Sequence, residues 1–216
     1  MISVSFFRPV DYFSGAFNRF VTWMTSGDFC HCELIVRVAP QTILDVIKDI
    51  HRGAQHGQYP EEDCPRIISG IETNFFDDVE FRKAVQTEGN TIALSFSLIW
   101  GTPMSVRVLH DQTPDSWFQY PPLSSGGSVQ RVDITSEEKH VSDTLKFAIE
   151  ELGKDYDTSG ALCSWIPWTS ETKHGRHEAY FCSEFVVTAL QRIGYLEGIS
   201  AKHTTPNALY TVIQKQ

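Results

Sequence analysis

Cys182 and His31 are the two side chains whose types and positions best suit nucleophilic chemistry. Cys182 follows a loop and begins the segment CSEFVVTALQRIG, whose apolar residues recur at helical spacing. Unpaired N–H groups and the positive end of the helix dipole would favour a thiolate there, and a thiolate is the attacking form of cysteine. The alternative interpretation is a buried cysteine that only fills the core.

His31 lies in FCHCELIVRV (29–38), a segment rich in β-branched and apolar residues that predicts a strand. A Cys–His enzyme needs an imidazole within reach of the thiol and a polar group on the other ring nitrogen. We expect Asp45 to be that group, on a second hairpin strand at 42–47. Glu33 is the alternative third member, because it shares the face of His31 two residues along the same strand.

The run Cys30-His31-Cys32 also raises the possibility of a metal site. Strand alternation places His31 on the face opposite both cysteines, so the three side chains are not expected to converge on one ion. The chain has no C-x-x-C pair, which structural zinc sites commonly use. We therefore predict neither a metal nor another cofactor.

The elements that would position these residues indicate an α+β fold, with helices on an antiparallel sheet of five or six strands. Strands are predicted at 2–7, 29–38, 42–47, 90–101 and 104–110, and helices at 11–25, 135–153, 179–195 and after Pro206. Thr135 and Glu138 form a potential capping box, and Gly153 a helix stop. Residues 51–90 predict loop with one short helix or strand, and 111–128 a long loop.

Composition narrows the class of protein. The chain has 216 residues and a net charge of −9, which argues against a nucleic-acid partner because phosphate binding needs clustered Lys and Arg. It shows neither a signal peptide nor an apolar run long enough for a transmembrane segment. Its five irregularly spaced cysteines suit a reducing compartment. We expect a soluble, intracellular (cytoplasmic) protein.

Four segments together resemble the permuted NlpC-like branch of the papain-like cysteine hydrolase superfamily. That branch includes YaeF/YiiX-type bacterial proteins, relatives in large DNA viruses and, more distantly, the lecithin-retinol acyltransferase family. The matching segments are RFVTWMTSGDFCHCELIV, ITSEEK with FAIEELGKDYD, YFCSEFVVTALQRIGY and HTTPNALY. The family more often has Ser where this chain has Cys30, and Gly or another residue where it has Glu33. Its third member is usually His or Glu on the next strand, so Asp45 is less usual in that slot.

The resemblance implies a single circularly permuted papain-like domain over 1–216, with a variable insertion around 51–130. It implies Cys182 as nucleophile, His31 as base and Asp45 as the orienting group. The expected reaction passes through a thioester on an amide bond of a peptide or isopeptide. A lipid acyltransferase or phospholipase acting on a lipid acyl substrate is one alternative, and a catalytically inactive binding module is another. Viral relatives raise the host cytoplasm as a location.

Overall fold

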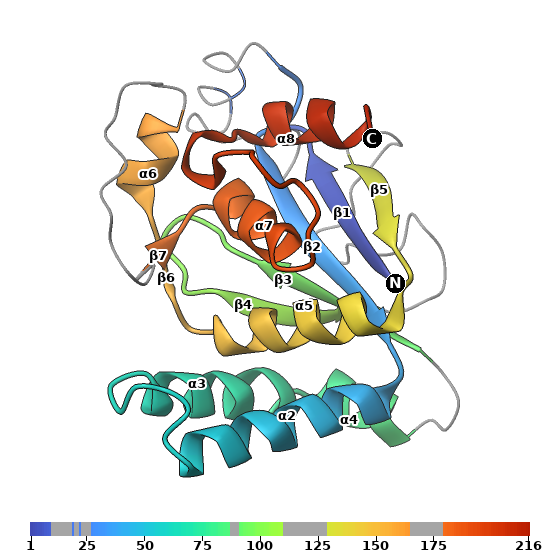
Figure 1. Ribbon diagram of the computed structural model, residues 1–216, viewed down its shortest axis with the longest axis vertical. Helices are drawn as coiled ribbons and strands as arrows, with labels where there is room; N and C mark the ends of the chain where they lie inside the picture. The colour runs from blue at the N-terminus through green and yellow to red at the C-terminus, as the bar shows by residue number, and fades with distance from the viewer. Residues whose placement is uncertain (10–18, 20–21, 23–26, 87–90, 110–128, 165–178) are drawn as a thin grey trace.

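The fold is described from a computed structural model of residues 1–216 (Figure 1). The description covers the whole chain except residues 10–18, 20–21, 23–26, 87–90, 110–128 and 165–178. The expected helix at 11–25 and the expected loop at 111–128 lie mostly or wholly outside the described residues.

A five-stranded antiparallel sheet forms the centre of the protein, in the order β4-β3-β2-β1-β5. Its strands are β1 (Ile2–Phe7), β2 (His31–Val38), β3 (Ile92–Ser97), β4 (Ser105–Leu109) and β5 (Val129–Thr135). The predicted strands at 2–7, 29–38, 90–101 and 104–110 are therefore confirmed, within a residue or two at most ends. β2 is the middle strand, and every residue in it except Arg37 is buried.

One face of the sheet is covered by two helices, α5 (Glu138–Glu150) and α7 (Cys182–Gln191), which lie in front of β2 in Figure 1. The residues Val4, Leu34 and Phe96 align across neighbouring strands and belong to the same buried apolar cluster as the helices. Strand residues alternate in direction, so the other face carries buried polar side chains such as Glu33 and Ser95 together with a small apolar cluster of Ile35, Ala93 and Leu109. The predicted α+β architecture with an antiparallel sheet is confirmed.

The predicted strand at 42–47 is wrong. Residues 40–55 form helix α2 (Pro40–Gln55), which begins with a proline at its first turn. Ile43, Val46, Ile47 and Ile50 are buried on one side of this helix, and their spacing of three and four residues is helical. The six residues of TILDVI show too little of this period to separate a helix from a strand.

The prediction of mainly loop between 51 and 90 is also wrong. This part of the chain contains the end of α2 together with α3 (Cys64–Ile71), the π-helix η2 (Glu72–Phe76) and α4 (Val79–Gln86). The helices bury Ile67, Ile71 and Phe75 in the common apolar cluster. Their short length and polar outer faces explain why the sequence reads as loop.

The remaining elements follow the sheet's last strand. They are β6 (Asp155–Tyr156), α6 (Thr158–Cys163), β7 (Ala179–Tyr180), the 3-10 turn η3 (Ala201–His203) and α8 (Pro206–Ile213). Gly153 ends the α5 region with a φ of 79°, as its sequence position predicts. The capping box is not formed: α5 begins after Glu137, whose N–H donates to the Thr135 hydroxyl. No helix among the described residues is long and apolar enough to cross a bilayer.

Candidate active site

A short pair of parallel strands, β6 and β7, positions the start of the helix that carries Cys182. Tyr180 in β7 pairs with Tyr156 in β6, and the N–H of Asp157 donates to the carbonyl of Tyr180 over 2.8 Å. α7 starts two residues later with Cys182 at its first position. The G-K-x-Y-D motif of the family-like segment FAIEELGKDYD (Gly153, Lys154, Tyr156 and Asp157) therefore has a structural role, since its last residues fix the backbone that leads into the cysteine helix.

His31 is held by the opposite end of the chain. Asn207, in the first turn of α8, clamps the backbone of Phe29: its Oδ1 accepts from the Phe29 N–H and its Nδ2 donates to the Phe29 carbonyl, both over 2.8 Å. The ring of Tyr210 also packs on Phe29, with 4.7 Å between ring centroids. Asn207 and Tyr210 belong to the T-P-N-x-L-Y motif (205–210) of the family-like segment HTTPNALY, which thus fixes the segment that enters β2 just before His31.

The structure places the side chains of His31 and Cys182 close enough to interact, since each shifts the pKa of the other. Both residues are only 5% exposed. The meeting joins residues 151 positions apart in sequence, through the packing of α7 on β2.

The contact occurs at an open stretch of β2. The N–H groups of successive strand residues point alternately to the two neighbouring strands. The N–H of Arg37 donates to the carbonyl of Met1 on the β1 side. Cys32 is five residues before Arg37, so its N–H points to the opposite side, toward β3. β3 pairs with β2 only from Leu34 onward, so it does not reach Cys32. On this side of the strand, the Cys182 sulfur interacts with the backbone N–H and the thiol of Cys32, which affects the pKa of both cysteines.

Glu33 lies on the other side of the His31 ring. Its Oε1 is 3.3 Å from Nε2 of His31, which leaves Nδ1 as the ring nitrogen for Cys182. Ser95 Oγ donates to Oε2 over 2.5 Å, and the Arg107 guanidinium donates to both carboxylate oxygens over 2.7 Å. The Glu33 side chain is 0% exposed, so these three partners replace the water it has lost.

The charges of the cluster favour an ion pair at its centre. Hydrogen bonding from Cys32, followed by the positive charge of His31, lowers the pKa of Cys182 well below that of an ordinary thiol although burial opposes this. Burial also opposes protonation of His31, but the Cys182 thiolate and Glu33 together raise the pKa of the imidazole to about 9. Both shifts favour a thiolate and an imidazolium over a neutral thiol and imidazole.

Glu33 and Cys32, the two titratable groups beside this pair, differ in their protonation. Burial disfavours the Glu33 carboxylate, yet the hydrogen bond from His31 and the charge of Arg107 lower its pKa to about 2. Burial raises the pKa of the Cys32 thiol well above its usual value, so Cys32 stays protonated and able to donate. Cys182, His31, Glu33 and Arg107 then carry two negative and two positive charges, which sum to zero.

Asp45 is not brought to the imidazole. It lies in α2 with a side chain 59% exposed, 2.8 Å from the Gln41 amide and 3.5 Å from Lys48. The expectation that it would hold His31 is a consequence of the wrong strand at 42–47. Glu33, the alternative third member, occupies that position instead, because two long side chains spaced two residues apart on one face can touch.

Three partners were missed by sequence reasoning. Ser95 and Arg107 face each other across β3 and β4, and Cys32 was treated only as a possible metal ligand. Arg107 carries a signal that could have identified it, since a charge between Val106 and Val108 in a predicted strand calls for an acidic partner. Nothing in the sequence marks Ser95.

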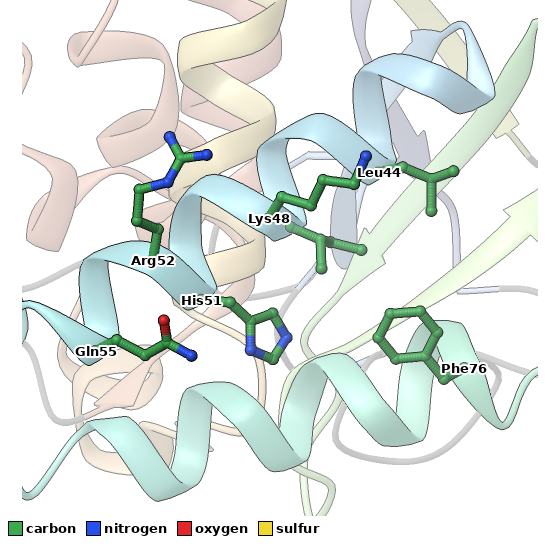
Figure 2. Close-up of a pocket in the computed structure, with 7 residues that line it drawn as sticks. Leu44, Lys48, His51, Arg52, Gln55 and Phe76 are labelled. Carbon is green, nitrogen blue, oxygen red and sulfur yellow. The ribbon is translucent and has the colours of Figure 1, made fainter.

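Among the described residues, no group of three or more His, Cys, Asp or Glu side chains is arranged to hold a metal ion. A pocket of about 400 Å³ lies elsewhere, between α2 and Phe76 of η2 (Figure 2). Lys48 and Arg52 at this pocket are paired with neighbouring aspartates of their own helix. It contains neither Cys182 nor His31.

Comparisons with known proteins give no match: no family model, no curated protein and no solved structure is similar to this chain. A buried thiolate beside an imidazolium, with a carboxylate behind the ring, has the parts required for nucleophilic attack and proton transfer.

Proposed function

We propose that this chain is a cysteine hydrolase that cleaves an amide bond, peptide or isopeptide, through a thioester on Cys182. The observation that carries the proposal is the contact between the His31 imidazole and the Cys182 sulfur at the start of α7. The lowered thiol pKa, which persists although burial opposes it, favours reaction over a purely structural role.

The roles follow from the positions of the groups. The Cys182 thiolate attacks the substrate carbonyl carbon, forming a C–S bond while the carbonyl electrons move to oxygen. The backbone N–H of Cys182 at the first helical position is suited to stabilise that oxyanion. The His31 imidazolium then gives its proton to the leaving amine as the C–N bond breaks, which leaves a thioester.

In the second half of the reaction, neutral His31 takes a proton from water, and the resulting hydroxide attacks the thioester carbonyl. The C–S bond breaks, releasing the acid and restoring the thiolate beside the imidazolium. Glu33 orients the imidazole throughout and stabilises its positive charge. Ser95 and Arg107 act as positioning residues, because they touch Glu33 and not the reacting atoms.

The proposed fold is the circularly permuted papain-like arrangement, in which the histidine strand precedes the cysteine helix. Support comes from the chain order of His31 and Cys182 and from the helix packed on an antiparallel sheet. The G-K-x-Y-D and T-P-N-x-L-Y motifs support it further, since each binds the backbone two residues before one of the proposed reacting residues.

The decisive experiment is capture of the acyl-enzyme. The purified protein is mixed with activated peptide esters and, separately, with phosphatidylcholine vesicles, then quenched in acid for mass spectrometry. We expect a peptidyl thioester on Cys182 that neutral hydroxylamine removes. An acyl adduct formed only from phospholipid would favour the lipid acyltransferase alternative, and no adduct from either source would support an inactive binding module.

Matched variants identify the nucleophile. Cys182→Ala should abolish the adduct, whereas Cys163→Ser, a change at a partly buried cysteine in α6, should leave it unchanged. An adduct that persists in Cys182→Ala would contradict the proposal.

A further inference from the structure

Cys32 and Cys182 form a pair of thiols that the hydrolytic mechanism does not require. Cys32 is 1% exposed and lies on the central strand, while Cys182 begins the helix packed against it. Helix α7 packs on β2, Cys32 and Cys182 belong to the same buried cluster, and the two side chains shift each other's pKa. All five cysteines of the chain are free thiols in this structure.

We infer that Cys32 and Cys182 are a reversible oxidation site, in which a peroxide converts the two thiols into an intramolecular disulfide. The inference is linked to the proposed function at one point: a disulfide at Cys182 would also stop hydrolysis, because Cys182 is the proposed nucleophile. Formation of the disulfide itself requires no catalytic activity on an amide.

The chemistry proceeds in two balanced steps. The Cys182 thiolate attacks one oxygen of the peroxide, the O–O bond breaks, and Cys182 becomes a sulfenic acid while the other oxygen leaves as an alcohol or water after taking a proton. The Cys32 sulfur then attacks the sulfenic sulfur, and the Cys32 proton leaves with the hydroxyl as water. An external dithiol reverses the result by thiol–disulfide exchange.

Cys32 is better placed for this step than Cys30. The Cys30 thiol donates to the carbonyl of Phe7, with 3.5 Å between sulfur and oxygen, so its side chain is directed at β1. Cys32 instead belongs to the buried cluster that contains Cys182, between β2 and the helix packed on it. A resolving cysteine already in contact with the nucleophile would compete with further oxidation of the sulfenic acid, which is irreversible.

The test uses the full chain treated with a small excess of hydrogen peroxide and quenched with N-ethylmaleimide. Trypsin places Cys32 and Cys30 in the peptide 20–37 and Cys182 in the peptide 177–192. We expect these two peptides to be linked without reductant and separate after dithiothreitol. We also expect a more than tenfold loss of Cys182 alkylation that dithiothreitol restores.

Two serine variants assign the link. Cys30→Ser should retain it, and Cys32→Ser should lose it and accumulate sulfinic acid on Cys182. A link that survives in Cys32→Ser, or sulfinic acid forming equally fast in the unsubstituted protein, would overturn the inference. A disulfide-linked peptide pair without any acyl-enzyme would support the oxidation site and refute the proposed hydrolase. An acyl-enzyme without the disulfide would support the hydrolase and refute the oxidation site.

Discussion

Glu33 and His31 touch on the same strand, with 3.3 Å between Oε1 of the carboxylate and Nε2 of the imidazole. The i, i+2 spacing places both side chains on one face of β2, and Ser95 and Arg107 from the next two strands complete the surroundings of the carboxylate. The orientation of the imidazole therefore depends on three adjacent strands, while the thiol it faces comes from a helix.

Alkylation of Cys182 should depend on pH far less than alkylation of an ordinary thiol. A free cysteine with a pKa near 8.5 loses reactivity roughly 200-fold between pH 9 and pH 6. The lowered pKa of Cys182, caused by the Cys32 hydrogen bond and the His31 charge, should reduce this ratio. Iodoacetamide labelling followed peptide by peptide measures it. His31→Ala should return the ratio toward that of the free thiol, and an unchanged ratio would contradict the ion pair.

Glu33→Gln should slow both acyl-enzyme formation and the alkylation of Cys182 at pH 6 by about 10- to 100-fold, the range for loss of a hydrogen bond to a charged group. The reason is that the amide stabilises the imidazolium less than the carboxylate does. Asp45→Asn is the matched control, because Asp45 is exposed on α2. We expect less than a twofold effect from it. The reverse pattern would restore Asp45 as the orienting group.

Stability should decrease in acid because of Glu33. The folded-state pKa of about 2 lies below the ordinary value of 4.5, owing to the His31 hydrogen bond and Arg107. A lowered carboxyl pKa stabilises the folded state fully above pH 4.5, and that stabilisation is lost as pH falls toward 2. Urea unfolding at several pH values measures the slope. Glu33→Gln should be less stable at pH 6 and should show a shallower decline below pH 4.5; an equal decline in both proteins would be the contrary result.

Arg107→Met should destabilise the protein by about 1–3 kcal/mol, because it removes two hydrogen bonds to a buried carboxylate. We expect a value in the lower part of this range, because the Arg107 side chain is 37% exposed and water screens its charge. Arg107→Lys should recover part of the loss, since an ammonium keeps the charge without the bidentate geometry. Denaturant midpoints measure both. Equal destabilisation by Met and Lys would show that packing, not charge, determines the effect.

Asn207→Ala should cost about 1–3 kcal/mol, since it removes both hydrogen bonds to the Phe29 backbone. It should also slow Cys182 alkylation at pH 6, because the clamp fixes the segment leading to His31. Thr211→Ala, an exposed change on the same helix, should stay within about 0.5 kcal/mol. A loss of stability with normal alkylation would limit Asn207 to a role in folding.

Local signals predicted the elements on which the proposed catalytic residues lie. The β-branched run around His31 predicted β2, and the apolar period after Cys182 predicted α7. These signals act over a few neighbouring residues, so they are present in the sequence itself. The segment 42–47 was misassigned because a window of six residues contains less than two helical turns.

The sequence alone determined the residue types, the approximate places of β1, β2, β3, β4, α5 and α7, and the candidacy of Cys182 and His31. Only the tertiary structure decided that Glu33, and not Asp45, touches the imidazole, and that Cys32 interacts with the sulfur of Cys182. The physical reason is that these contacts depend on where β3 stops pairing with β2 and on how β4 brings Arg107 beside Glu33. The pairing of these strands is set by the packing of the whole sheet, and the spacing of residues along the sequence does not reveal it.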